Sequence, residues 1–313
     1  MKTPVVLIIF NRPEKTQKIL EVIREAKPSK LLVVADGPRP DRPGESELCN
    51  ATRLIVEQID WKCEVLKKYS DVNLGCALSP AQGISWAFDQ VDEAIILEDD
   101  CIPEPSFFRF CEEMLDRYRS DERVMHVSGN NYHPNVQRSE YSYFFSRYTL
   151  AWGWATWKRS WEKFDLEMKH WNEIKELGYL KDILFDERLA RNWTKSLQFV
   201  YDGNLDCWDF QWLFSCWVQN GLSIIPSVNL VSNIGSGSDA THTDKDNQCL
   251  HRSTEPLSFP LKHPPFVIRD AQADHLIQTT MFNYYPSLPE RVKAKLIKGM
   301  KAAGILRANT SAL

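Results

Sequence analysis

The feature that most constrains this chain is the alternation, over its first hundred residues, of short apolar runs with segments of helical periodicity. Residues 5–10, 31–35, 63–66 and 94–97 are the apolar runs, and the first and last are continuous, as in strands buried on both faces. Between them, apolar side chains recur at three- and four-residue steps, which is typical of amphipathic helices. We therefore expect an α/β fold with a mostly parallel central sheet and helices on both faces.

The pattern continues with an expected helix over residues 107–118 and a strand over residues 124–127, and loses its regularity after Tyr141. We expect residues 1–250 to form the main α/β domain and residues 251–313 a partly helical C-terminal extension.

Polar clusters follow the expected strands where each one ends. They are Asn11-Arg12, Asp36-Gly37, Asn73-Leu74-Gly75 and Glu98-Asp99-Asp100. In an open parallel sheet the ligand site lies at the carboxyl ends of the strands, so these clusters should meet at one edge.

The acidic triplet Glu98-Asp99-Asp100 is the strongest of these signals. Three adjacent carboxylates repel one another and are best tolerated where a cation offsets their charge. Mg²⁺ and Mn²⁺ take oxygen ligands, often one or two carboxylates together with substrate phosphates. The position at a strand end favours such a site over the alternative of a solvated acidic turn.

The triplet lies in a stretch, residues 97–108, that resembles the N-acetylglucosaminyltransferase I family and its bacterial relatives. Residues 124–130 and Gly153-Trp154 extend the resemblance, which covers residues 4–245. It implies a GT-A fold in which residues 1–250 are the catalytic domain, and Glu98-Asp99-Asp100 is the local form of an Asp-x-Asp motif. By this resemblance Asp100 ligates Mn²⁺ or Mg²⁺, which bridges the donor diphosphate, and Asp99 faces the ribose.

The same resemblance implies that Asn11, Arg12 and Asp36 contact the nucleotide, with Asp36 near the base. Two local alternatives remain open. Asn11-Arg12-Pro13 is also a helix-capping pattern, and an Asp-Gly pair is common in ordinary turns.

Residues 208–212, Trp-Asp-Phe-Gln-Trp, resemble the family segment that supplies the catalytic base. By this resemblance Asp209 deprotonates the acceptor hydroxyl, a function worth roughly 10²–10⁴-fold in rate. Phe210 and Gln211 stand where the family has a second Asp, so Asp206 is an alternative base. A further alternative is that Asp209 only caps the helix that starts there.

Tryptophan is concentrated between Trp152 and Trp212, where most of the chain's 11 tryptophans lie. Residues 152–157 and Trp161 are either a surface on which sugar rings stack or part of the core. Farther along, residues 233–243 are small and polar, and predict a mobile loop over the donor. His242 in this loop is a candidate second contact to the metal or diphosphate, or else a solvent-exposed histidine.

Composition excludes some classes of function. The formal net charge is -4, with acids and bases interspersed, so no basic field exists for a nucleic-acid partner. The apolar run at residues 5–10 is too short to span a membrane, and we expect a cytoplasmic protein. Residues 289–306 form a basic amphipathic pattern, for which we expect either contact with the inner face of an anionic membrane or packing on the catalytic domain.

Together these features predict transfer of a sugar from a nucleotide-diphosphate donor, with UDP implied by the resemblance, to an acceptor hydroxyl with inversion. The acceptor is expected to be a glycan or a lipid-linked molecule. The alternatives are a sugar-nucleotide nucleotidyltransferase, a non-catalytic carbohydrate-binding protein on the same fold, and a glycosidase.

Overall fold

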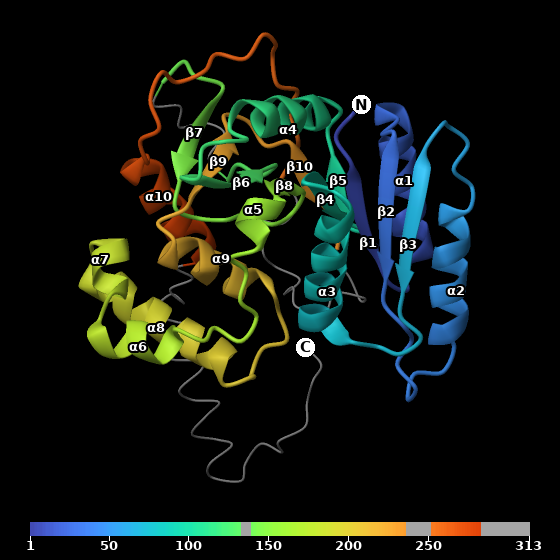
Figure 1. Cartoon of the computed structure of the whole chain (residues 1–313), viewed down its shortest axis with the longest axis horizontal. Coiled ribbons are helices and arrows are strands. Elements are labelled where there is room, and N and C mark those ends of the chain that lie inside the picture. The colour runs from blue at the N-terminus through green and yellow to red at the C-terminus, as the bar shows by residue number, and fades with distance from the viewer. Residues whose placement is uncertain (133–138, 236–251, 283–313) are drawn as a thin grey trace, which may run out of the picture.

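The computed structural model describes residues 1–132, 139–235 and 252–282. In this part of the chain an eight-stranded sheet has helices packed on both faces (Figure 1), which confirms the expected α/β class. The strands are β1 (Val5–Ile9), β2 (Lys30–Ala35), β3 (Glu64–Tyr69), β4 (Glu93–Glu98), β5 (Cys101–Pro103), β6 (Val124–Ser128), β7 (Tyr143–Ser146), β8 (Trp154–Trp157), β9 (Leu222–Pro226) and β10 (Val231–Asn233). The helices are α1 (Pro13–Ala26), α2 (Glu45–Val56), α3 (Gly75–Gln90), α4 (Ser106–Arg117), α5 (Lys158–Trp161), α6 (Trp171–Leu177), α7 (Leu180–Leu184), α8 (Glu187–Tyr201), α9 (Asp209–Val218), α10 (Ala271–Ile277) and a π-helical turn η1 (Gln278–Phe282).

The first half of the chain forms the parallel part of the sheet. The strand order is β3-β2-β1-β4-β8-β6-β9-β7, and β1 pairs in parallel with both β2 and β4. Val5 stands opposite Leu31 on one side and Ile95 on the other. The carboxyl ends of β1, β2 and β4 therefore lie next to one another.

The second half adds antiparallel strands that the sequence pattern did not predict. Strand β8 lies between β4 and β6 and is antiparallel to both, and β7 is antiparallel to β9 at the edge. Strands β6 and β9 also pair in parallel, so parallel pairings outnumber antiparallel ones in this sheet and the expected mostly parallel sheet is confirmed.

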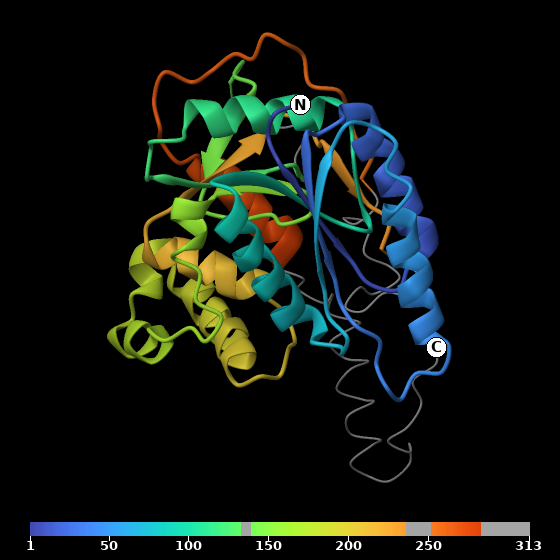
Figure 2. The same cartoon turned by 45° about the vertical axis from the view of Figure 1, so that its right-hand side comes forward.

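The side chains of β1 show how the two faces are covered. Val5, Leu7 and Ile9 belong to a core cluster with α1 and α4, whereas Val6 and Ile8 point to the opposite face and pack with α3 and Trp212 of α9. Successive strand residues alternate between faces, so a fully apolar strand needs helices on both sides. Figure 2 shows α1 and α3 on opposite sides of the sheet.

A second hydrophobic cluster joins α6, α7 and α8 to α9 and to the described end of the chain. Asp274 of α10 is buried and accepts hydrogen bonds from Ser146 Oγ at 2.6 Å and Arg147 Nε at 3.0 Å. Tyr148 donates to Gln278 Oε1 at 2.6 Å. Residues 252–282 are thus packed against the rest of the fold, and the domain boundary at residue 250 stays a prediction.

Two expectations fall outside the described residues: His242 with the rest of its loop after residue 235, and the basic helix at residues 289–306. Among the described helices, none has the length and apolar character needed to cross a membrane.

Candidate active site

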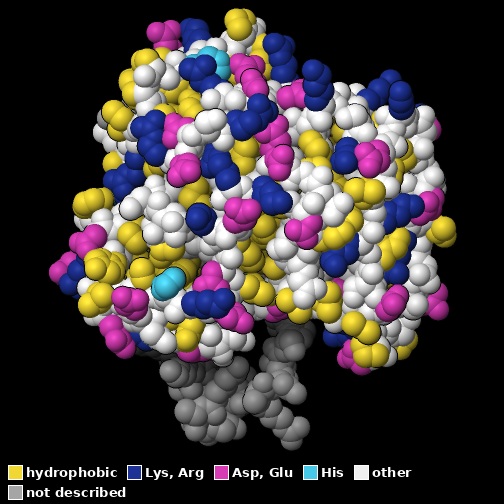
Figure 3. Space-filling model, in the orientation of Figure 1, with side chains coloured by type: hydrophobic (Ala, Val, Ile, Leu, Met, Phe, Trp, Pro, Cys, Tyr) yellow, Lys and Arg dark blue, Asp and Glu magenta, His cyan; other side chains and the backbone are white. Residues whose placement is uncertain are grey.

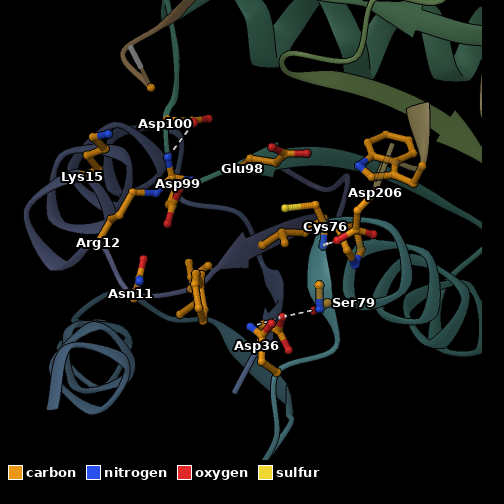
Figure 4. Close-up of a pocket in the computed structure, with 18 of the residues that line it drawn as sticks. Asn11, Arg12, Lys15, Asp36, Cys76, Ser79, Glu98, Asp99, Asp100 and Asp206 are labelled. Carbon is orange, nitrogen blue, oxygen red and sulfur yellow. Dashed lines mark hydrogen bonds and ion pairs between the residues drawn. The ribbon is translucent and has the colours of Figure 1, made fainter. Parts of the chain in front are cut away.

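A cavity of about 970 Å³ opens at the carboxyl ends of β1, β2 and β4. All four polar clusters expected there contribute to its lining, including Arg12, Asp36, Asn73 and Asp100, so the predicted convergence is confirmed. Figure 4 shows Arg12 and Lys15 on one side of this cavity, Asp206 and Cys76 on the other, and Glu98 between them. Its size lies in the range of small-molecule and cofactor sites.

The acidic triplet forms the turn between β4 and β5. Arg12, at the start of α1, reaches across it, with Nη2 at 2.5 Å from Asp99 Oδ1 and Nη1 at 2.9 Å from Asp100 Oδ2. Asp99 is almost fully buried, and Asp100 is slightly more exposed. One guanidinium therefore faces two carboxylates in a shielded position, and the group of Arg12, Asp99 and Asp100 is negative overall.

The charge of this turn is reflected in the pKa values of its acids. Burial raises the pKa of Glu98 above the usual range, and the charges of Asp100 and Asp99 raise it further. Burial also raises the pKa of Asp99, whereas the charge of Arg12 acts to lower it. A second cation at this turn would favour the ionised forms of Glu98 and Asp99.

The small sheet of β5 and β10 brings a distant segment to the same turn. The backbone N–H of Ile234 donates to the carbonyl oxygen of Asp100 at 2.8 Å. A Cβ on Gly235 would lie 2.3 Å from Asp100 Oδ2, so only glycine fits against this carboxylate. The glycine-containing loop was expected to act on the donor, but the pairing of its first residues with the acidic turn was not foreseen.

Asp36 lies on the cavity wall, with both carboxylate oxygens engaged. It accepts hydrogen bonds from Gly37 N at 2.8 Å, Asn73 Nδ2 at 2.9 Å, Leu74 N at 2.9 Å and Gly75 N at 3.1 Å. Asp36 thus fixes the turn that leads into α3, which is consistent with the turn interpretation of Asp36-Gly37. Its contact with a nucleotide base stays a prediction.

The helix-capping interpretation of Asn11-Arg12-Pro13 is wrong in that neither Asn11 nor Arg12 caps α1 with its side chain. The N-cap of α1 is Arg12, whose side chain makes no capping hydrogen bond because it pairs with the acidic turn. Asn11 Nδ2 instead donates to Glu45 Oε1 at 2.9 Å. Both residues line the cavity, as expected for nucleotide contacts.

The two candidate bases occupy different positions. Asp206 accepts hydrogen bonds from Cys76 N at 2.8 Å and Ala77 N at 2.9 Å, so it caps the N-terminus of α3. Asp209 is the first residue of α9. The N-cap of this helix is Trp208, which makes no side-chain capping hydrogen bond, so the N-cap interpretation of Asp209 is wrong. Asp209 lines the cavity.

The tryptophans of residues 152–161 divide into two groups. Trp154, Trp157 and Trp161 are at most 4% exposed and belong to the core, so they do not form a sugar-binding surface. Trp152 is partly buried and lines the cavity.

The sequence interpretation missed several lining residues. Lys15, in the first turn of α1, lines the cavity beside Arg12 (Figure 4). Arg39 also lines it, pairs with Glu45, and lies 5.6 Å from the centre of the Phe10 ring. Lys15 belongs to the polar face of an ordinary amphipathic helix, and the Arg39–Glu45 pair lies in a polar loop, so neither carried a local signal.

The donor atoms at the acidic turn fit a hard divalent cation. Carboxylate oxygens of Asp100 and its neighbours are the ligands that Mg²⁺ and Mn²⁺ prefer. Among the described residues no group of three Asp, Glu, His or Cys side chains is arranged as a complete metal site. These side chains therefore fit a cation that takes one or two protein ligands and completes its coordination with substrate phosphates and water.

No family model matches the chain, and no curated protein is similar to it in sequence. Among solved structures, residues 1–349 of TarS from S. aureus match 53% of this chain and 50% of their own, at 17% identity and a TM-score of 0.36. The galactosyltransferase LgtC, solved with donor and acceptor sugar analogs, matches 69% of this chain and 70% of its own, at 9% identity and a TM-score of 0.36. UDP-glucose pyrophosphorylase, complexed with UDP-glucose, matches 52% of this chain and 79% of its own, at 10% identity and a TM-score of 0.32.

The chain thus spans about half the length of the TarS structure that it matches. Similarity at this level carries no conclusion about activity, and the resemblance to the N-acetylglucosaminyltransferase I family stays a prediction.

Proposed function

We propose that this chain is a metal-dependent GT-A glycosyltransferase that moves a sugar from a nucleotide-diphosphate donor, with UDP as its nucleotide, to an acceptor hydroxyl with inversion. One observation carries the proposal. Arg12, Asp99 and Asp100 meet in a cavity that also holds the separate carboxylate of Asp209. Such a site has a place for a diphosphate and a group able to remove a proton.

The donor side lies at the start of α1. Arg12 and Lys15 line the cavity there, and the first turn of a helix favours anionic groups. A divalent cation held by Asp100 would neutralise the charge that develops on the departing diphosphate. When the diphosphate binds, Arg12 is positioned to exchange part of its contact with Asp99 and Asp100 for phosphate oxygens.

On the acceptor side, Asp209 is the proposed base. The acceptor oxygen forms a bond to the anomeric carbon while the bond from that carbon to the diphosphate oxygen breaks, and Asp209 takes the hydroxyl proton. Asp206 is the weaker candidate because its carboxylate accepts hydrogen bonds from two backbone N–H groups of α3. By the resemblance, the transferred sugar is N-acetylglucosamine, and the acceptor is a glycan or a lipid-linked molecule.

The alternative of a nucleotidyltransferase has less support. That chemistry needs a glycine-rich phosphate loop with a basic residue directly after the first strand. In this chain β1 is followed by Phe10-Asn11-Arg12-Pro13, and Arg12 is paired with the acidic turn. Asp209 would have no role in nucleotidyl transfer.

The test uses the full chain with Mn²⁺ and a panel of nucleotide sugars. We expect one donor to release nucleoside diphosphate, slowly with water and faster with a sugar acceptor. In a parallel reaction, pyrophosphate is added in place of an acceptor. Formation of nucleoside triphosphate and sugar 1-phosphate there, without release of diphosphate in the first reaction, would identify a nucleotidyltransferase instead.

A further inference from the structure

The basic residues in the described lining of the cavity are unevenly distributed, whereas carboxylates line it throughout. Its basic lining residues, Arg12, Lys15 and Arg39, all come from the first forty residues. The described lining residues after position 150 include no Lys or Arg, but they include Asp206 and Asp209. Figure 4 shows Arg12 and Lys15 on the side of the cavity away from Asp206. Among the described lining residues, an anionic donor would therefore meet cationic partners beside Arg12 and Lys15, whereas a second anion near Asp206 would meet carboxylates alone.

Of the two tryptophans in the described lining of the cavity, Trp152 is the one that the core does not enclose. Trp208, the other tryptophan lining it, is 5% exposed and is stacked on Trp154 with ring centres 5.4 Å apart. Trp152 is only partly buried. It therefore keeps ring surface available to a molecule in the cavity.

The backbone explains why Trp152 and Trp154 have different surroundings. Gly153 has a φ of +67°, a conformation that other residues rarely adopt, and a Cβ there would lie 2.7 Å from a methyl carbon of Val231. Gly153 also accepts a hydrogen bond from Gly129 N at 2.8 Å through its carbonyl oxygen. This turn sends Trp154 into the core and leaves Trp152 at the cavity.

The Trp152 ring is held in place by contacts with its neighbours. The ring of Tyr132 meets it edge-on, with centres 6.0 Å apart and planes at 76°. Trp152 also packs against two hydrophobic clusters, the one that contains Val5, Leu7 and Ile9 and the one that joins α8 to α9. A rigid aromatic ring loses little conformational entropy when it binds a ligand.

We propose that Trp152 is the platform on which an uncharged sugar ring of the acceptor stacks. This proposal rests on the proposed function and names its acceptor class. The apolar face of a pyranose lies on the indole, which leaves the hydroxyl groups at the ring edge to reach Asp209. A phosphorylated or otherwise anionic acceptor would meet Asp206 and Asp209 without a basic partner among the described lining residues of that side.

The probes are the methyl β-glycosides of glucose, galactose and N-acetylglucosamine, and the anionic counterparts glucose 6-phosphate and galactose 6-phosphate. Binding to the full chain with UDP and Mg²⁺ is measured by saturation-transfer NMR titration. Trp152→Ala and Trp152→Leu remove the ring, and Trp152→Phe retains one. Trp86→Ala is the matched control, because Trp86 is also a partly buried tryptophan but lies on α3 outside the cavity lining.

We expect at least one neutral glycoside to bind, and Trp152→Ala and Trp152→Leu to weaken it by about tenfold, as expected for lost ring contact. Trp152→Phe and Trp86→Ala should stay within about threefold. The proposal is overturned if the ring-deleted variants bind the glycoside like the wild type, if no neutral glycoside binds, or if only the sugar phosphates bind. Nucleotide affinity, measured by calorimetry on the same samples, distinguishes failure of the Trp152 proposal from failure of the proposed function. If the wild type binds neither UDP nor a nucleotide sugar, the proposed function itself is refuted.

Discussion

Arg12 Nη1 lies 2.9 Å from Asp100 Oδ2, and the same guanidinium contacts Asp99 through Nη2. The side chain that follows the first strand thus neutralises part of the acidic turn that follows the fourth. Both strands end at the same edge of the sheet, so this ion pair joins the start of α1 to the candidate metal ligand Asp100.

Removal of the Arg12 guanidinium should make the stability of the protein depend more strongly on a divalent metal. Arg12→Met leaves Asp99 and Asp100 without their partner, and breaking a buried ion pair on one side typically costs about 3 kcal/mol. We expect the variant to melt lower in EDTA and to gain more from Mn²⁺ than the wild type does. Thermal melting of both proteins with EDTA and with Mn²⁺ measures this. Equal metal-induced shifts would show that Arg12 and the metal do not share these carboxylates.

Arg24→Met is the matched control for this experiment. Arg24 pairs with Asp60 on the protein surface, where ion pairs contribute little. Its replacement should leave both the melting temperature and the effect of Mn²⁺ nearly unchanged.

The activity should require the metal. With Asp100 as a ligand, chelation should abolish transfer, and Mn²⁺ or Mg²⁺ should restore it. The measurement is nucleoside diphosphate release in EDTA and after metal is added back. Full transfer in excess EDTA would contradict this prediction and would assign stabilisation of the leaving group to Arg12 and Lys15 alone.

The roles of Asp209 and Asp206 can be separated by neutral replacements. Asp209→Asn should leave nucleotide-sugar affinity nearly intact while transfer falls by roughly 10²–10⁴-fold, because the proton acceptor is lost. Asp206→Asn keeps a side-chain oxygen that can cap α3, so most of the turnover should remain. Asp206→Ala removes the cap and should destabilise the fold by about 1 kcal/mol. The variants are distinguished by three measurements: donor affinity by calorimetry, turnover, and denaturant unfolding. A turnover loss in Asp206→Asn but not in Asp209→Asn would show that Asp206 is the base and Asp209 is not.

A buried histidine should make the fold sensitive to acid. His126 is fully buried, faces the carbonyl oxygen of Leu150 through Nε2 at 3.2 Å, and accepts a hydrogen bond at Nδ1 from Trp212 Nε1 at 3.1 Å. Burial lowers its pKa from 6.5 to about 3, although the Leu150 carbonyl opposes the shift. Between these two values the unfolded chain binds one more proton than the folded chain, so stability is complete above pH 6.5 and falls as the pH decreases toward 3.

The slope of this loss should approach about 1.4 kcal/mol per pH unit. In His126→Gln this part of the pH dependence should disappear, although the variant is less stable at neutral pH. Urea unfolding between pH 4 and 8 measures the difference between the two proteins, with the exposed His170→Gln as control. An unchanged slope in His126→Gln would show that His126 is not held neutral by burial.

The parallel half of the fold could be predicted because its signals are local. The continuous apolar run at Val5–Ile9 and the helical periodicity of Pro13–Ala26 each depend only on neighbouring residues. Their connection places the polar residues at one edge of the sheet, which is why the cavity was predicted from Asn11, Asp36 and Asp100. The antiparallel strand β8 has no such signal, because nothing in residues 154–157 specifies β4 and β6 as its partners.

The details of the site depend on contacts between distant parts of the chain. Asp206 caps α3 by accepting from Cys76 N, 130 residues earlier in the chain, and Asn233 pairs with Cys101 across a similar separation. The different surroundings of Trp152 and Trp154 follow from the positive φ of Gly153, where an added Cβ would also lie 2.7 Å from a methyl carbon of Val231. Composition and spacing carry no information about such contacts.

The central claim is that the cavity binds a nucleotide sugar together with a divalent metal. The most direct measurement is thermal unfolding of the wild type and Asp100→Asn with a panel of nucleotide sugars, each with Mn²⁺ and with EDTA. A ligand at a hundred times its dissociation constant stabilises the folded state by about 2.7 kcal/mol. We predict that a UDP-sugar raises the melting temperature of the wild type only with Mn²⁺, and that Asp100→Asn loses most of this shift. If no nucleotide sugar stabilises the wild type with the metal present, the claim is wrong.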